Sequence, residues 1–169
     1  MAAKKFLRLV SGVLTEVFGV QTSTGAGNAG DLVSLDDSGR IDNSMMPVGI
    51  GADTASLTAS EALAAGDYIN VWNDAGTPKM RKADATAAGK EADGFVLAAV
   101  SSGVAGTAYF EGTNTQVSGQ TAGSVYLQTT AGAGGSTVPS ASGNVVQRLG
   151  TAVGTTAVNF ERGTPVTLA

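Results

Sequence analysis

The residues that most enzymes use as nucleophiles, bases and metal ligands are scarce in this sequence. The chain has no cysteine and no histidine, which removes thiolate nucleophiles, Cys-type zinc sites and the commonest general base. A serine nucleophile would need a lysine as its base, and Lys79, Lys82 and Lys90 lie in polar segments that we expect to be exposed. Glu111 is the best remaining candidate for acid–base work on a glycosidic bond, but we expect it to share a solvent-facing side of its strand with Tyr109. The sequence therefore predicts that the protein is not an enzyme.

Two patterns with a superficial resemblance to binding motifs lie in the first quarter of the chain. Residues 25–30 match G-x-G-x-x-G, but they lack the preceding buried strand and the following helix that a dinucleotide site requires. We interpret them as part of a linker. The carboxylates of Asp31, Asp36, Asp37 and Asp42 could attract Ca²⁺, but the adjacent Asp36 and Asp37 break the alternation of a calcium loop and no glutamate closes it. Turn formation explains these aspartates better, so we predict no metal and no cofactor.

Two groups of residues remain as candidates for binding. Tyr68 and Trp72 lie on one face of an alternating segment, where they could form a platform for a carbohydrate or pack against a neighbouring strand. Three of the ten basic residues cluster near the start, as Lys4, Lys5 and Arg8. These charges either face solvent or meet an acidic surface. The net charge of −4 gives no basic footprint for nucleic acid.

The composition predicts an ordered, all-β protein. Only 14% of the 169 residues are charged and 24 are glycine, and the low charge argues against disorder. No apolar run approaches the ~20 residues of a membrane span, and no signal peptide is evident because Arg8 and Glu16 interrupt the early apolar segment. We therefore expect a soluble protein that is made in the cytoplasm. With only 5% aromatic residues, its core must be made largely of Val, Leu and Ala, and such chains tend to gain stability from other subunits.

The strongest strand signal lies between residues 92 and 112. Residues 95–100 form an unbroken apolar run after Gly94, which is too short for a comfortable helix and right for a buried strand. Residues 107–112 alternate, with Ala108 and Phe110 on one face, as a half-buried antiparallel partner would. We predict a hairpin whose first strand is central. Further strands are expected at residues 67–73, 79–82, 124–130, 144–149, 152–153, 157–160 and 165–168, which together predict a small antiparallel β-barrel or sandwich.

The first 54 residues are predicted to form an extended arm with its own short hairpin. Residues 6–17 contain two apolar runs around Ser11-Gly12, which favours a hairpin; an amphipathic helix is the alternative, although Gly12 would cost it about 1 kcal/mol. A flexible spacer at 21–30, a strand at 31–35, a turn at 36–39 and a second spacer at 48–54 are expected. Asp42, Asn43 or Ser44 could cap one helical turn that Pro47 ends. The predicted domains are therefore the arm (1–54) and an antiparallel β-domain (55–169).

Several stretches resemble structural proteins of tailed double-stranded-DNA bacteriophages. Residues 33–47, VSLDDSGRIDNSMMP, are similar to a joint that recurs in their fibre and capsid decoration proteins. Residues 65–73, 80–85, 94–100 and 109–114 are similar to a β-domain found in such proteins. The resemblance implies a non-enzymatic homotrimer on the capsid exterior, a decoration (cement) or head-fibre protein whose partner is the major capsid protein.

The arm is the expected capsid contact. We predict that the contact is made by residues of both basic and apolar character, namely Lys4, Lys5, Phe6, Leu7, Arg8, Leu9 and Val10. The alternative is a tail- or head-fibre module that binds a receptor or host-surface carbohydrate through Tyr68 and Trp72. In neither case do we expect nucleic acid or membrane as a partner.

Overall fold

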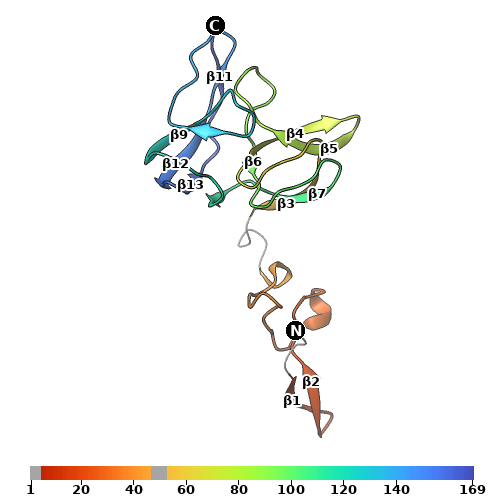
Figure 1. Cartoon of the computed structure of the whole chain (residues 1–169). Helices are drawn as coiled ribbons and strands as arrows, with labels where there is room; N and C mark the ends of the chain where they lie inside the picture. The colour runs from red at the N-terminus through yellow and green to blue at the C-terminus, as the bar shows by residue number, and fades with distance from the viewer. Residues whose placement is uncertain (1–4, 47–52) are drawn as a thin grey trace. The chain divides into compact units, whose positions relative to one another are not determined.

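The computed structural model describes residues 5–46 and 53–169, which belong to two compact units, Met1–Gly51 and Ala52–Ala169. Within the described residues the regular elements are β-strands and two short 3₁₀ turns (Figure 1). The predicted all-β class is confirmed. No helix in the described part of the chain is long and apolar enough to cross a membrane.

The first unit begins with the predicted hairpin. Strand β1 (Lys5–Val10) pairs with β2 (Val13–Phe18) in an antiparallel ladder that runs from Lys5↔Phe18 to Val10↔Val13. The two loop residues, Ser11 and Gly12, have φ of 50° and 84°, as a two-residue turn whose twist matches the strands requires. The hairpin prediction is confirmed over the helical alternative.

The rest of the first unit is organised by side-chain hydrogen bonds to the backbone. The predicted strand at 31–35 is wrong, because only Val33 pairs, in a single parallel bridge to Val20. The predicted spacer at 21–30 contains the 3₁₀ turn η1 (Ala26–Asn28), and Asn28 Oδ1 accepts from the amide and hydroxyl of Thr24, both at 2.8 Å. That spacer is therefore a folded loop.

The predicted helical turn forms as η2 (Asn43–Met45). Its cap is Asp42, whose side chain accepts a hydrogen bond from the Ser44 amide at 2.9 Å, as expected for a carboxylate at a helix start. Pro47 and most of the second predicted spacer lie outside the described residues. Thr54, at the end of that spacer, already belongs to a strand.

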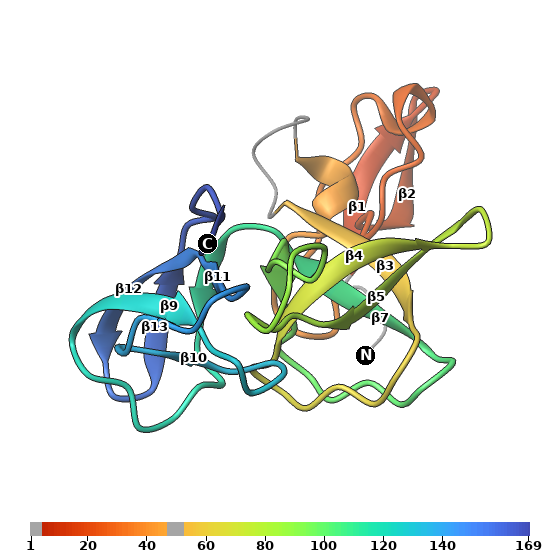
Figure 2. The ribbon, with the colours of Figure 1, turned by 90° about the horizontal axis from the view of Figure 1, so that it is seen from above.

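The second unit contains a closed barrel and a twisted sheet beside it (Figures 1 and 2). The barrel has the order β3-β5-β4-β6-β7. Most neighbours are antiparallel, as predicted, and one pair, β3 with β5, is parallel through Thr58↔Lys79 and Ala59↔Met80. The barrel strands are β3 (Thr54–Ala59), β4 (Tyr68–Asp74), β5 (Thr77–Lys82), β6 (Gly94–Phe95) and β7 (Ala105–Tyr109).

The sheet has five strands in the order β10-β9-β12-β13-β8, and a separate pair, β11 with β14, lies near the end of the chain. Within the five-stranded sheet, every strand is antiparallel to its neighbours. The strands are β8 (Gly112–Asn114), β9 (Gly123–Leu127), β10 (Gly134–Gly135), β11 (Val145–Val146), β12 (Arg148–Gly154), β13 (Ala157–Phe160) and β14 (Val166–Thr167).

Two hydrophobic cores stabilise the second unit, and β4 contributes to both. Tyr68 belongs to the larger cluster, with Phe95, Leu127, Leu149 and Phe160, whereas its neighbour Ile69 belongs to a second cluster that includes Met80 and Val96. Successive side chains of a strand point to opposite faces. Both faces of β4 are therefore covered at its start, so the strand is not half-exposed there.

The central hairpin is shorter than predicted. Strand β6 covers only Gly94–Phe95, and its one pair with β7 is Phe95↔Tyr109. The chain then leaves β7, because the amides of Val96 and Val100 donate to the carbonyls of Asp67 and Leu63 at 3.1 and 3.0 Å. The expected solvent-facing position of Tyr109 is also wrong. Its ring stacks on Phe95, with 5.5 Å between the ring centroids.

Candidate functional site

The β1–β2 hairpin exposes apolar side chains on both faces. Directly opposed residues of an antiparallel pair share a face, so Leu7, Leu9, Leu14 and Phe18 lie on one side. The three leucines are 68%, 65% and 69% exposed. A hairpin that packed on a core would bury one face, so this surface is unusual for a folded protein.

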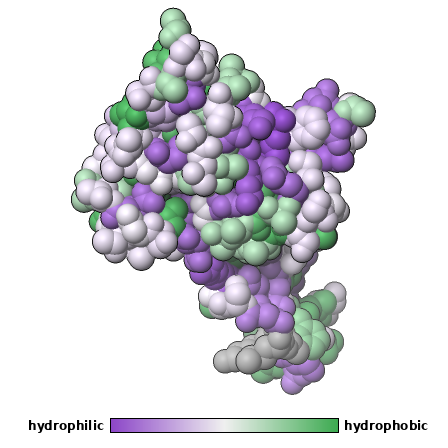
Figure 3. All heavy atoms as spheres, turned by 45° about the horizontal axis from the view of Figure 1, so that its top comes forward, coloured by the Kyte–Doolittle hydropathy of each residue, from purple (hydrophilic) through white to green (hydrophobic). Residues whose placement is uncertain are grey.

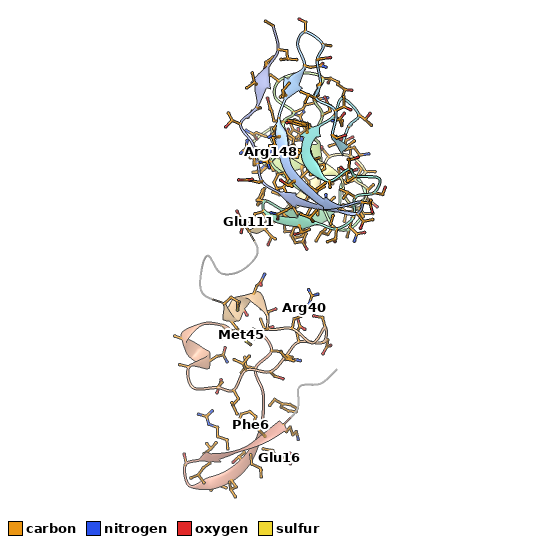
Figure 4. All side chains as sticks on the ribbon, turned by 90° about the vertical axis from the view of Figure 1, so that its left-hand side faces the viewer. Phe6, Glu16, Arg40, Met45, Glu111 and Arg148 are labelled. Atoms are coloured by element: carbon orange, nitrogen blue, oxygen red, sulfur yellow. The ribbon has the colours of Figure 1, made fainter. Side chains whose placement is uncertain are left out.

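The second face of the hairpin also carries apolar side chains. Phe6 and Val17 are partly buried, whereas Val10 and Val13 are exposed at the turn end. Figure 4 labels Phe6 and Glu16, which belong to opposite faces of the two strands. An isolated two-stranded hairpin is marginally stable in water. The exposed apolar side chains of this hairpin and its marginal stability in isolation therefore both favour association with another protein surface.

The basic residues of the hairpin are already paired within the first unit. The ammonium of Lys5 lies 2.9 Å from a carboxylate oxygen of Glu16 and 5.2 Å from the centroid of the Phe18 ring. Arg8 lies 2.9 Å from Asp31, whose second oxygen accepts from Asn28 at 3.2 Å. Two of the three predicted cations are therefore balanced internally. Lys4 lies outside the described residues. Among the hairpin residues that the structure describes, the exposed surface combines apolar side chains with cations that are already paired.

The aspartates of the first unit serve as turn and cap groups. Asp36 Oδ1 accepts from the Ser38 amide and hydroxyl and from the Arg40 amide. The Ser38 hydroxyl, followed by the Arg40 amide, lowers the pKa of Asp36 below its ordinary value. Asp42 has a lowered pKa for the same kind of reason, through Ser44. Among the described residues no group of three or more acidic side chains is placed to hold a metal ion.

The predicted ligand face at Tyr68 and Trp72 is wrong. Tyr68 is 1% exposed, and its ring packs 5.9 Å from that of Phe160. Trp72 is partly buried, its indole N–H donates to Ser60 Oγ at 3.2 Å, and the guanidinium of Arg81 lies 4.9 Å from the ring centroid. The two aromatic residues share a strand face, but the start of that face is covered by the five-stranded sheet. They form no exposed platform.

The remaining catalytic candidates are scattered. Glu111 is exposed between β7 and β8 (Figure 4). Lys79, Lys82 and Lys90 each form an ion pair with a carboxylate. The three aspartates that bind them are Asp74 at 2.6 Å, Asp67 at 3.5 Å and Asp84 at 3.0 Å.

Two buried polar groups of the second unit were not predicted from the sequence. Gln147 is fully buried, and its side chain binds both backbone groups of Ala92. The phenol of Tyr68 is buried without a hydrogen bond to any described residue. Nothing in the local sequence marks either position, because a glutamine in a Val-Val-Gln-Arg segment and a tyrosine in an alternating strand are both common on exposed surfaces.

Comparison of the chain with protein-family models, with curated proteins and with solved structures found no match. The fold and the surface by themselves define an all-β protein of two units, the first of which exposes an apolar hairpin. Figure 3 shows, by contrast, that apolar residues on the visible face of the second unit are scattered in small groups among pale and hydrophilic ones.

Proposed function

We propose that the protein is a non-enzymatic structural component of a phage particle, which binds the outside of the capsid as an oligomer and stabilises or decorates it. The observation that carries the proposal is the β1–β2 hairpin, whose leucines at positions 7, 9 and 14 are about two-thirds exposed. It supports the arm as the contact with the major capsid protein. The class of partner is proposed from the resemblance of residues 33–47 to a joint in phage decoration and fibre proteins.

The protein would stabilise the capsid because apolar surface is buried between the two only in the assembled particle. Full burial of one leucine is worth about 1.5–3 kcal/mol, and a protein that bridges neighbouring capsid subunits adds this free energy to the shell. A trimer would present three hairpins at once, and each later contact would benefit from a high effective concentration. We include a homotrimer on the capsid exterior in the proposal for this reason.

The hairpin contact is proposed to be apolar rather than electrostatic. Lys5 and Arg8 are paired with Glu16 and Asp31, and exposed ion pairs contribute at most about 1 kcal/mol. Binding should therefore weaken only slightly between low and high salt. A contact made by an unpaired basic arm would lose affinity steeply over the same range.

The test is to mix purified full-length protein with undecorated capsids and to measure saturable binding together with the melting temperature of the shell. We expect Leu7→Ser, Leu9→Ser and Leu14→Ser combined to abolish both effects, and deletion of residues 1–20 to do the same while a folded oligomer remains. The matched control replaces three exposed valines of the second unit, Val104, Val153 and Val166, which are 52%, 66% and 59% exposed. Full binding by the leucine variant would refute the assignment of the hairpin.

The alternative function is a fibre module that binds a receptor or host-surface carbohydrate. Its predicted site at Tyr68 and Trp72 is not exposed, so a module of this kind would need another surface. Binding of the isolated protein to host cells, unaffected by the leucine substitutions, would favour it over the capsid proposal.

A further inference from the structure

The first unit lacks a hydrophobic core of its own. None of residues 5–46 is buried, whereas the second unit encloses two clusters of buried side chains. Eleven of the fifteen large apolar residues that are exposed in the described part of the chain belong to residues 5–46, although residues 53–169 are the much longer range. The apolar surface that the protein leaves uncovered is therefore concentrated in its first unit.

A folded unit of this size usually needs an additional source of stability. Below about 70–80 residues a single core rarely suffices, and natural proteins add disulfides, a structural metal or association with other subunits. The first unit spans Met1–Gly51 and the chain has no cysteine. Among residues 5–46 no group of three or more acidic side chains is placed to hold a metal ion. Association with another protein surface is the source of stability that fits these residues.

Five of the exposed apolar residues lie outside the hairpin, between residues 32 and 46. They are Leu32, Val33, Leu35, Ile41 and Met46, which are 55%, 58%, 54%, 51% and 37% exposed. An interface of standard size has about 20–30 residues a side, and fewer than a third of them carry most of the binding free energy. Five large apolar side chains in one short segment can therefore form the centre of an interface.

The stretch around Val33 exposes apolar side chains on opposite sides. It pairs with Val20, whose amide donates to the Leu32 carbonyl and whose carbonyl accepts from the Ser34 amide, both at 2.8 Å. Successive side chains of such an extended backbone point to opposite sides, and Leu32 and Val33 are both exposed. One flat surface, such as that of a capsid, covers one side only. The other side needs a second surface.

The acidic groups beside these residues are compatible with contact between identical chains. Copies of one chain carry the same charges, and burying an unpaired charge between them is costly. Asp36 Oδ1 accepts from the Ser38 amide and hydroxyl and from the Arg40 amide. Asp42 accepts from the Ser44 amide at 2.9 Å. Both carboxylates are thus bound within their own turns, where they stabilise local structure.

A second copy of the chain is the partner that meets these conditions. A unit without a core becomes ordered as it associates, so its partner must be present whenever the chain folds. Another copy is always present then, whereas a capsid surface is met only after assembly of the shell. A cyclic oligomer also places a neighbour on two different sides of each protomer, as the opposed exposure of Leu32 and Val33 requires.

We propose that the first unit is the self-association element of the protein, in which the apolar residues of 32–46 are buried against the first unit of a second copy. This assignment rests on the oligomer of the proposed function. It gives the contact between copies to Leu32, Val33, Leu35, Ile41 and Met46 and leaves the hairpin leucines for the capsid. The second unit has two cores of its own and is not needed for the contact.

The experiment is to measure the molar mass of the full-length protein, without capsids, by sedimentation equilibrium over a range of concentrations. We expect an oligomer whose mass is insensitive to salt, because the contact is apolar. Leu32→Ser, Leu35→Ser and Ile41→Ser combined should raise the dissociation constant about a hundredfold or more, since three half-exposed side chains lose their burial. The matched control carries Val104→Ser, Val153→Ser and Val166→Ser in the second unit and should remain an oligomer.

Hydrogen exchange gives a second readout that reports on the first unit directly. The amides of Val20 and Ser34 donate to backbone carbonyls within this unit. They should be protected in the oligomer and exchange faster in the variant at positions 32, 35 and 41, because the dissociated unit has no core to hold it. The fluorescence of Trp72 in the second unit should show the same urea unfolding in this variant as in the unaltered protein.

A monomeric unaltered protein would overturn the proposal, and so would an oligomer that the substitutions at 32, 35 and 41 leave intact. Undiminished protection of Val20 and Ser34 in a monomeric variant would also overturn it. Dissociation caused by the substitutions at 7, 9 and 14 alone would transfer the contact to the hairpin. If the free oligomer dissociates as expected but the unaltered protein binds no capsid, the contact between copies stands and the capsid role fails.

Discussion

The buried side chain of Gln147 joins the barrel to the five-stranded sheet and to the end of the chain. Its Oε1 accepts from the Ala92 amide at 2.7 Å, and its Nε2 donates to the carbonyls of Ala92 at 2.8 Å and Gly163 at 3.2 Å. The side chain is fully buried. The backbone of Ala92, in the loop before β6, therefore obtains both of its hydrogen bonds from one side chain on the segment between β11 and β12.

We predict that Gln147→Met destabilises the second unit severely. Methionine has a similar length and is flexible, so the cavity term is small. The substitution leaves the amide and carbonyl of the fully buried Ala92 without partners, and each such group costs about 1–3 kcal/mol. The expected loss in the free energy of unfolding is roughly 2–6 kcal/mol, a large part of the ~5–15 kcal/mol that a domain possesses.

The assay is urea unfolding at a fixed protomer concentration, followed by the fluorescence of the single tryptophan, Trp72. Gln128→Met is the matched control. Gln128 Nε2 also donates to three carbonyls, those of Tyr126, Gly135 and Thr137, but Gln128 is partly exposed and water can replace these bonds. A loss in Gln147→Met below about 1 kcal/mol, or no larger than in Gln128→Met, would refute the reasoning.

Three further predictions follow from backbone geometry and burial. Gly12→Ala should weaken the hydrogen-exchange protection of the β1–β2 amides by about fivefold, because a residue with a Cβ is strained by about 1 kcal/mol at a φ of 84°. Unchanged protection would contradict the turn geometry. Gly94→Ala should lower the free energy of unfolding by about 1–3 kcal/mol, because the new Cβ would overlap the Tyr109 carbonyl oxygen. The control is Gly154→Ala, whose Cβ would enter open space, and it should change the free energy of unfolding by less than about 0.5 kcal/mol. Equal effects in urea titrations would contradict the tight β6–β7 contact. Burial raises the pKa of Tyr68 above its ordinary value of 10.0. The contribution of the neutral phenol to the free energy of unfolding should therefore be fully present at pH values below 10.0. This contribution should fall as the pH rises further, because the phenol ionises first in the unfolded chain. Tyr68→Phe should lack this part of the alkaline loss, and identical alkaline unfolding curves would show that the phenol is not buried.

Local features of the chain were predictable from the sequence because they depend on residues only a few positions apart. The turn at Ser11-Gly12 needs two residues that tolerate positive φ between β-forming runs, and the cap at Asp42 needs a carboxylate two residues before an amide that has no partner inside the helical turn. The absence of histidine and cysteine narrows the possible chemistry, whatever the fold. Low charge and frequent glycine likewise predicted the all-β class, and each of these inferences rests on local geometry or on composition.

Tertiary structure decided which faces are buried and where strands stop pairing. Tyr68 and Ile69 alternate as in a half-exposed strand, yet both are buried, because distant segments cover each side of β4. The apolar run after Phe95 leaves its ladder because the backbone of residues 63–67 takes its hydrogen bonds. Gln147 looks like a surface residue until the loop of Ala92, 55 positions away, is placed against it. An alternating sequence pattern indicates that the two faces of a strand differ in polarity, but it does not show which segments pack against each face. That packing depends on contacts between residues far apart in the chain.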